Sequence, residues 1–248
     1  MALSLQRKIS AIVLVLYWPT LFIFAHIPIP QVVREADVSD KSLHFLGYLV
    51  LVYLLWFAAR GDEKVNWRGL GPWWILAIMA LYGVFDEWSQ NYVAGRTCDV
   101  QDFLADVVGT VGGLVLFSVF TFWPAGLLVT AIVIFGVTNV TRADLAGLMP
   151  VTSAAFHLFA YAVFTALWVQ YIRRFPSALR APRGGAKWLM AVAAGPVALL
   201  LIVKLFSVIA GRVFAVRDML VSAGGIGVIV AVVYVAALFH RAKRGAAE

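Results

Sequence analysis

Residues 41–59 read KSLHFLGYLVLVYLLWFAA, an apolar run with a lysine and a histidine at its start. A helix of this length comes close to crossing the roughly 30 Å of hydrocarbon in a bilayer. The whole chain has the same character: 62% of its 248 residues are hydrophobic, 13% are charged, and the mean hydropathy is +0.90. Because this composition lies far from that of soluble domains, we predict an integral membrane protein.

Eight apolar segments of near-spanning length follow one another along the chain. We therefore predict an all-α fold, a polytopic membrane helical bundle with about eight transmembrane helices. The segments cover residues 9–27, 42–59, 70–90, 101–123, 127–140, 153–171, 188–208 and 216–238. The fifth segment is short for a full crossing and closely follows Pro124, so seven helices with one re-entrant or broken segment stay an alternative.

Lysine and arginine are unevenly divided between alternate loops. With the N-terminus inside, the inner segments hold 13 of these 20 residues and the outer loops hold six. Cytoplasmic loops are enriched in positive charge, so we predict that both termini are cytoplasmic. The net charge of +7 is then mainly a topology signal, and the pattern offers no soluble basic face for nucleic acid.

The chain contains an internal repeat. HFLGY at 44–48 recurs as HLFAY at 157–161, 113 positions later, and AGR at 94–96 recurs at 210–212, 116 positions later. An even number of helices in each half makes the halves parallel, related by an axis along the membrane normal. We predict two four-helix repeats, residues 1–123, which carry the polar site, and residues 124–248, a degenerate copy.

Six of the 13 acidic residues lie in three polar strings at the ends of predicted helices, all on the predicted outer side. The three strings are Asp40, Lys41, His44 and Tyr48, then Asp86, Glu87 and Gln90, then Arg96, Asp99, Asp102 and Asp106. Within each string, residues three or four apart share a helix face. Ionisable groups in or beside lipid are costly unless they pair or line a wet cavity, so the strings predict one outward-facing polar pocket.

The second repeat lacks most of this chemistry. The counterparts of Asp86, Glu87, Gln90, Asp99 and Asp106 are Ile202, Val203, Phe206, Ala215 and Ser222. Groups needed only for packing would be expected in both copies, so the one-sided loss favours a functional site in the first repeat. The alternative is an ion-pair network that serves folding alone. The recurrence of His44 and Tyr48 as His157 and Tyr161 favours a packing role for that pair.

The order of the strings resembles the VanZ-like family. The chain reads DKxxHFxxY from residue 40, DExxQ from residue 86 and GRxxDxxD from residue 95, with a glycine further on. The resemblance covers residues 10–123 with every string and residues 127–240 as a weaker copy. Ala94 and Asp106 depart from it, where the family often has Pro and usually has Asn. The family's namesake is associated with teicoplanin resistance, so the resemblance implies a bacterial inner-membrane protein of the cell envelope that affects glycopeptide susceptibility.

These observations suggest a pocket that binds or processes an envelope amphiphile or a lipid-linked phosphate, with membrane lipids around it. Arg96 and Lys41 would hold phosphate, the arginine through its planar fork and the lysine as a point charge. The other substrate-binding candidates are Asp40, Tyr48, Gln90, Asp99, Asp102 and Asp106.

Catalysis and cation binding would draw on the same acids. The catalytic candidates, as general acid or base at a lipid-linked phosphate, are His44, Glu87 and Asp86. A divalent cation such as Mg²⁺ takes oxygen ligands, and its candidate ligands are Asp86, Glu87, Asp99 and Asp102. The single cysteine, Cys98, offers no zinc framework. Whether the protein is an enzyme stays open.

Two other classes of function stay open. A proton-coupled transporter would also use duplicated halves and carboxylates, but such carriers place their acids near the bilayer midplane. In this chain the acids lie toward one end of the helices. A structural or regulatory membrane protein without small-molecule chemistry is the remaining alternative.

Overall fold

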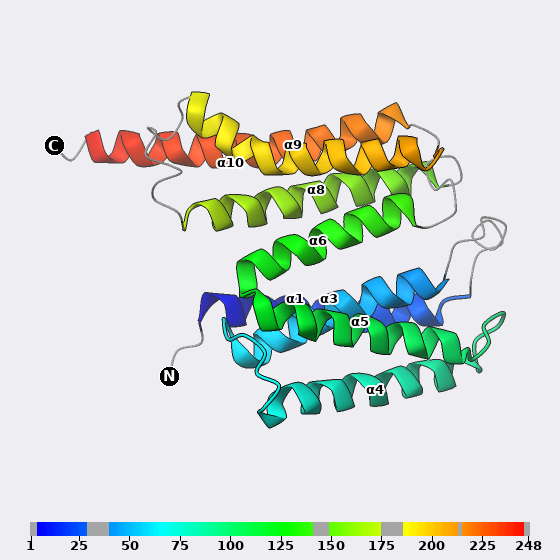
Figure 1. Ribbon diagram of the computed structural model, residues 1–248. Helices are drawn as coiled ribbons and strands as arrows, with labels where there is room; N and C mark the ends of the chain where they lie inside the picture. Colours follow the sequence, from blue (N-terminus) through cyan, green and yellow to red (C-terminus); the bar gives the residue numbers. More distant parts are fainter. Residues whose placement is uncertain (1–3, 29–39, 141–148, 175–185, 213–214, 246–248) are drawn as a thin grey trace. The chain divides into compact units, whose positions relative to one another are not determined.

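The protein is built of α-helices (Figure 1). The computed structural model describes residues 4–28, 40–140, 149–174, 186–212 and 215–245; the side chains of residues 40 and 240–245 lie outside the description. Its helices are α1 (Leu5–His26), α3 (Asp40–Arg60), α4 (Leu70–Gln90), α5 (Val100–Val119), α6 (Phe122–Asn139), α8 (Pro150–Ile172), α9 (Ala186–Ile209) and α10 (Val216–Gly245). No strand occurs in these ranges, so the predicted all-α class is confirmed.

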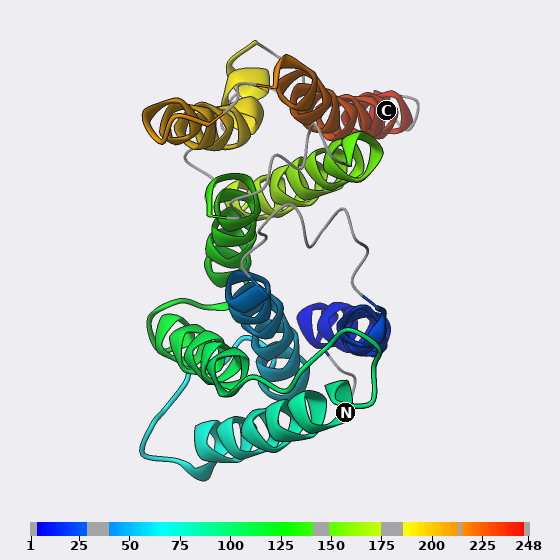
Figure 2. The same ribbon diagram turned by 90° about the vertical axis from the view of Figure 1, so that its right-hand side faces the viewer.

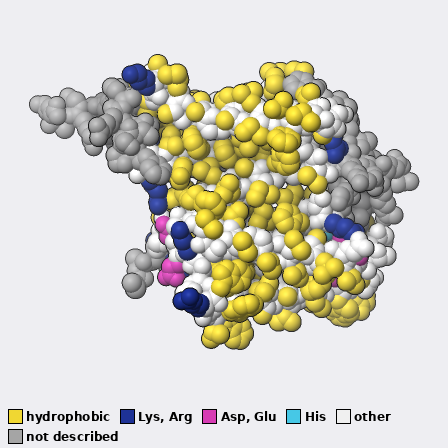
Figure 3. Space-filling model, in the orientation of Figure 1, with side chains coloured by type: hydrophobic (Ala, Val, Ile, Leu, Met, Phe, Trp, Pro, Cys, Tyr) yellow, Lys and Arg dark blue, Asp and Glu magenta, His cyan; other side chains and the backbone are white. Residues whose placement is uncertain are grey.

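Seven of the eight helices are long and apolar enough to cross a membrane. The eighth is α4, which has 21 residues but carries Asp86, Glu87 and Gln90 in its last turn. On the face shown in Figure 3, hydrophobic side chains cover the middle of the helices, and Lys, Arg, Asp and Glu side chains lie toward the ends. This distribution is that of a multi-pass membrane protein.

The boundary between the fourth and fifth predicted segments is wrong. The backbone of Phe120 is extended, so α5 ends at Val119 rather than continuing to residue 123. The next helix begins at Phe122, which places Pro124 in its first turn, where the missing N–H of proline removes no helical hydrogen bond. The added residues make α6 long enough to be one of the seven candidate spans.

The chain forms two compact units, Met1–Ala143 and Asp144–Glu248. The first holds α1 and α3 to α6, with α6 packed on α3 and α5, and the second holds α8, α9 and α10. Compact units and sequence repeats are different divisions of a chain. The repeat boundary after residue 123 therefore stays a prediction.

Helix α3 lies at the centre of the first unit, in contact with α1, α5 and α6 (Figure 2). Two glycines let α5 come close to it. A Cβ added to Gly109 would lie 2.5 Å from the Phe45 carbonyl oxygen, and one added to Gly113 would lie 2.5 Å from Val52 Cγ1. Small residues of this kind are what close helix packing in lipid requires. Gly112, on the same helix, faces nothing within 4 Å.

Aromatic packing fixes the other end of α3 against α5 and α6. Tyr53, Phe57, Phe117 and Phe122 form a cluster with ring centroids 5.0 to 5.8 Å apart. The Tyr53 hydroxyl donates to the Phe122 carbonyl at 3.1 Å, and the Phe122 N–H donates to Asp62 Oδ1 at 2.9 Å. These contacts hold α3 and α5 in one register, which in turn sets the positions of the polar groups at their opposite ends.

Candidate functional site

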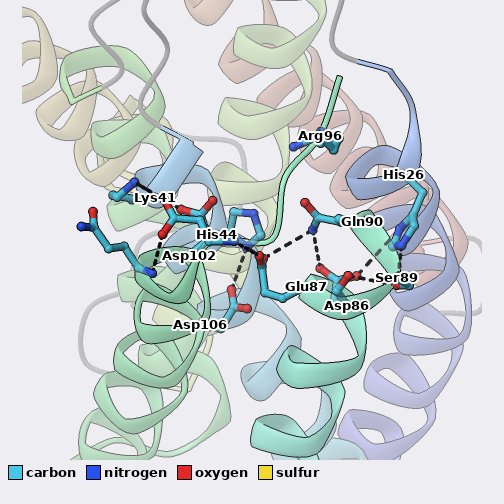
Figure 4. A network of polar contacts seen from close by, with 12 residues as sticks. His26, Lys41, His44, Asp86, Glu87, Ser89, Gln90, Arg96, Asp102 and Asp106 are labelled. Carbon is cyan, nitrogen blue, oxygen red and sulfur yellow. Dashed lines mark hydrogen bonds and ion pairs between the residues drawn. The ribbon is translucent and has the colours of Figure 1, made fainter. Parts of the chain in front are cut away.

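Four helix ends of the first unit meet at one place (Figure 4). They are the end of α1, the start of α3, the end of α4 and the start of α5. The polar side chains gathered there, here called the polar cluster, are His26, Lys41, His44, Asp86, Glu87, Ser89, Gln90, Arg96, Asp99, Asp102 and Asp106. The residues are up to 80 positions apart in the sequence. They meet because α1 and α4 end where α3 and α5 begin.

His44 lies at the middle of the polar cluster. Its Nδ1 is 2.9 Å from Asp106 Oδ1 and 3.8 Å from Glu87 Oε1. All three side chains are buried, with Glu87 exposing 3% and Asp106 1% of their surface. One imidazole nitrogen thus faces carboxylates from two other helices, and it donates to Asp106 when that group is ionised.

Glu87 ties α4 to the start of α5. Its Oε2 accepts the Asp99 backbone N–H at 2.9 Å, while Gln90 Nε2 lies 3.5 Å from its Oε1. The same Gln90 amide donates to Asp86 Oδ2 at 3.1 Å. One turn of α4 therefore orients two buried carboxylates, because residues three and four apart share a helix face.

Lys41, Asp99 and Asp102 form the exposed rim of the polar cluster. Lys41 Nζ lies 3.1 Å from Asp99 Oδ2 and 3.6 Å from Asp102 Oδ1. Asp99 also caps α5 by accepting the Gln101 N–H at 2.8 Å. That backbone N–H and the Lys41 ammonium hold the pKa of Asp99 below its ordinary value. The side chains of Lys41 and Asp99 are 46% and 39% exposed, so a solute can reach this rim.

Two residues that the sequence analysis did not select, His26 and Ser89, close the α1 side. His26 Nε2 lies 2.7 Å from Ser89 Oγ, and its Nδ1 lies 2.8 Å from the Phe22 carbonyl and 3.9 Å from Asp86 Oδ1. Arg96 Nη2 donates to the Phe24 carbonyl at 3.3 Å. His26 could have been selected from the sequence, because it lies at the predicted outer end of an apolar segment, on the same side as the acidic residues.

Several buried polar atoms in the polar cluster and on two tyrosines beside it have no hydrogen-bond partner. They are Asp86 Oδ1, Asp106 Oδ2 and the hydroxyls of Tyr48 and Tyr82. The Tyr48 hydroxyl interacts with the Asp106 carboxyl without meeting hydrogen-bond geometry, and its ring stacks on Tyr82 with centroids 5.8 Å apart. Buried polar atoms are almost always paired in folded proteins, so these atoms mark places where a further ligand would fit.

The structure thus gathers the predicted site residues, with one exception. Lys41, His44, Tyr48, Asp86, Glu87, Gln90, Arg96, Asp99, Asp102 and Asp106 all lie in or beside the polar cluster, whereas the side chain of Asp40 lies outside the described residues. The roles predicted for them stay predictions.

The residues placed closely enough to bind one metal ion differ from the four carboxylates predicted as its ligands. His44, Glu87 and Asp106 offer one ligand atom each, all within 4.8 Å of one another, and of the predicted set only Glu87 is among them. Asp99 and Asp102 face Lys41, and Asp86 faces Gln90 and His26.

Comparison with known proteins supports the first unit's assignment. The family model described as VanZ/LLP1 matches residues 5–121, which contain all three polar strings. The curated proteins and the solved structures give no significant match. The resemblance found in the sequence is therefore confirmed, and the proposed second copy stays a prediction.

Proposed function

Residues 5–121 of this chain match the VanZ-like family, and we propose that the polar cluster binds the phosphate head group of an envelope amphiphile or lipid-linked precursor. The observation that carries the proposal is the gathering of Lys41 and Arg96 with five carboxyl groups at one end of the first unit. Lipids present their phosphates at the same depth as helix ends. A charged cluster at that level meets a head group without entering the hydrocarbon.

The cationic groups are arranged for an anion at the rim. Lys41 is half-exposed, and its contact with Asp99 is an exposed ion pair, a kind of contact that adds little to stability. A phosphate with two charges competes well for such a lysine. Arg96 Nη2 donates to the Phe24 carbonyl, which places the guanidinium beside the cluster, and a planar guanidinium can hold two phosphate oxygens as a fork.

The position of the cluster supports surface binding over transport. Its residues lie in the first or last two turns of their helices or in the segment between α4 and α5, whereas carriers gather their coupling acids near the bilayer midplane. A proton-coupled transporter therefore remains the weaker proposal. If the bound phosphate ester is also cleaved or transferred, His44 and Glu87 are the groups placed to move a proton, with Asp86 behind them.

Lipid binding tests the proposal directly. The full chain is purified in mild detergent, and its affinity for a polyprenyl phosphate is measured by native mass spectrometry. We expect the Lys41→Ala, Arg96→Ala double variant to bind at least about tenfold more weakly, because losing even one of the two charge-assisted contacts would weaken binding by that factor. Arg212→Ala, the counterpart of Arg96 in the second unit, is the matched control and should bind as the wild type does. Equal binding by the double variant would refute the proposal.

A cellular test addresses the envelope role. Asp86→Ala and Glu87→Ala are compared with Ile202→Ala and Val203→Ala, the matched changes in α9, for glycopeptide susceptibility and for abundance in the membrane. We expect the α4 variants to be abundant and to alter susceptibility. If they vanish from the membrane, the cluster serves folding. Reporter fusions at both ends test the proposed bacterial inner-membrane topology, with both termini in the cytoplasm and the cluster on the outer side.

A further inference from the structure

Three side chains from three helices of the first unit converge on one point. His44 comes from α3, Glu87 from α4 and Asp106 from α5, and Figure 4 shows both carboxylates beside the imidazole. His44 Nδ1 lies 2.9 Å from Asp106 Oδ1 and 3.8 Å from Glu87 Oε1, and the three ligand atoms lie within 4.8 Å of one another. We propose that these residues form a transition-metal site of the zinc type.

The separations between ligand atoms match a metal of this size. Zinc binds histidine nitrogen and carboxylate oxygen at about 2.0–2.2 Å, which in a tetrahedron places ligand atoms about 3.3 Å apart. The observed 2.9 and 3.8 Å lie on either side of that value. The separation between the two carboxylate oxygens is at most 4.8 Å, so binding a metal would require side-chain movements that draw the three atoms together.

The chemistry of the three ligands selects the metal class. Mg²⁺ and Ca²⁺ take oxygen ligands, so an imidazole nitrogen at the centre of the site argues against them. Imidazole with carboxylates suits zinc and its neighbours in the first transition row. Three protein ligands leave a fourth position for water or a substrate oxygen, as in catalytic rather than structural zinc sites.

Buried polar atoms without hydrogen-bond partners lie on and beside one of the proposed ligands. Asp106 Oδ2 has no hydrogen-bond partner although the residue is only 1% exposed, and the adjacent Tyr48 hydroxyl, on a residue 2% exposed, has none either. With Asp106 Oδ1 on the metal, a metal-bound water near the Tyr48 hydroxyl would give that hydroxyl a hydrogen-bond partner. This observation is independent of the acidic character of the cluster.

Outer contacts already hold one ligand in place. The Asp99 N–H fixes Glu87 Oε2 at 2.9 Å, and the Gln90 amide approaches Oε1. Metal ligands in proteins are oriented by hydrogen bonds of this kind. The buried charges also favour a metal ion at this place. A dication would neutralise Glu87 and Asp106 together, without a buried lysine.

This inference holds whether or not the cluster binds a phosphate, and it is tested with metal alone. The full chain in detergent is stripped with a chelator and titrated with zinc chloride, with bound metal measured by mass spectrometry and unfolding followed by heat. Co²⁺ replaces zinc in a parallel sample. We expect about one zinc per chain, a higher Tm with metal, and an intense visible Co²⁺ band that reports four-coordinate geometry.

Variants locate the site. Glu87→Gln and Asp106→Asn should each weaken zinc binding at least about 100-fold, more than outer-shell changes usually do. His157→Gln in the second unit is the matched control, since the counterparts of Glu87 and Asp106 there are Val203 and Ser222. It should bind zinc as the wild type does.

Two results would overturn the inference. One is a wild-type chain that takes up no zinc and shows neither a Tm shift nor a Co²⁺ band, which would make the three residues a metal-free hydrogen-bonded network. The other is unchanged zinc binding in both variants. If the variants fail to fold, the wild-type titration and the Co²⁺ spectrum decide. Failure of lipid binding leaves these readouts unaffected, so the two proposals fail separately.

Discussion

His44 in α3 and His157 in α8 occupy equivalent places in their repeated strings, yet they contact different groups. His44 Nδ1 faces Asp106 and Glu87, which come from two other helices. His157 Nδ1 faces the Ser153 carbonyl of its own helix at 2.9 Å, with Asp218 more distant at 3.9 Å. The histidine position is shared, and the carboxylates around it are not.

In the described part of the second unit, the buried acid Asp218 is paired with a hydroxyl group and an arginine. Ser153 Oγ donates to Asp218 Oδ2 at 2.8 Å, and Arg217 reaches its Oδ1 at 3.3 Å. Ser222, at the position of Asp106, donates to the Asp218 carbonyl at 2.7 Å. This arrangement is satisfied with a single buried carboxylate.

The packing beneath these different groups is nevertheless alike. A Cβ on Gly109 would meet the Phe45 carbonyl oxygen at 2.5 Å, and one on Gly225 would meet the Leu158 carbonyl oxygen at the same distance. Gly95 and Gly211, in the corresponding turns, both have positive φ, 80° and 66°. These shared features support the predicted duplication. They also show that the packing of α8 on α10 needs no acid at the Asp106 position, which supports a role for the first unit's acids other than packing.

The largest difference between the units should come from removing the histidine. His44→Leu leaves Glu87 and Asp106 facing each other without their shared partner, and removing one member of a buried ionic network typically costs about 3–5 kcal/mol. His157→Leu breaks one hydrogen bond to a carbonyl, a loss of about 1–3 kcal/mol. Chemical denaturation in mild detergent measures both free energies of unfolding. Equal losses of unfolding free energy would show that the two histidines contribute equally to stability.

A smaller effect should come from filling the helix contact, and here the units should agree. Gly109→Ala and Gly225→Ala each push a methyl group into a backbone carbonyl, and overpacking of this kind costs about 1–3 kcal/mol. Gly112→Ala adds a methyl group to open space on α5 and should change the free energy by no more than about 0.5 kcal/mol. Thermal unfolding of the three variants checks this. A Gly225→Ala chain as stable as the wild type would argue against equivalent packing.

The smallest effect should come from the rim, which the second unit lacks. Asp99→Asn keeps an acceptor for the Gln101 N–H but removes the charge that faces Lys41. Because the pKa of Asp99 is lowered in the folded protein, its charge contributes stability above the ordinary aspartate pKa of about 3.9. That contribution disappears as the pH falls from there through the lowered value.

A pH series of Tm values tests this sign. The wild type should exceed Asp99→Asn at neutral pH, and the two curves should converge toward acid. Added salt should narrow the gap at neutral pH, because exposed pairs are screened. A gap that persists unchanged in strong acid would mean that the Asp99 charge is not its source.

The helices and the common end of the polar strings were predictable from the sequence. Apolar runs of spanning length and the offsets of repeated strings are local or periodic signals, and the hydropathy of residues 41–59 alone selects the membrane class. The end of α5 was not predictable to the residue. The apolar run continues through Phe120 and Thr121, so only the extended backbone at Phe120 shows the break.

Inside the site, the sequence could select residues but not their partners. It placed Asp86, Glu87 and Asp99 in one metal set, whereas these three contact Gln90, His44 and Lys41. It also omitted His26, because a single histidine at a helix end has no signal of its own until α1 packs beside α4.

By itself, then, the sequence determined the membrane class, the helical segments and the shared end of the first unit at which the polar strings lie, because hydropathy and spacing act along the chain. The tertiary structure decided that His44 meets Glu87 and Asp106, and that Gly109 rather than Gly112 carries the helix contact. The physical reason is that successive side chains on a helix differ in direction by about 100°. Packing against neighbouring helices decides which of them faces a given neighbour.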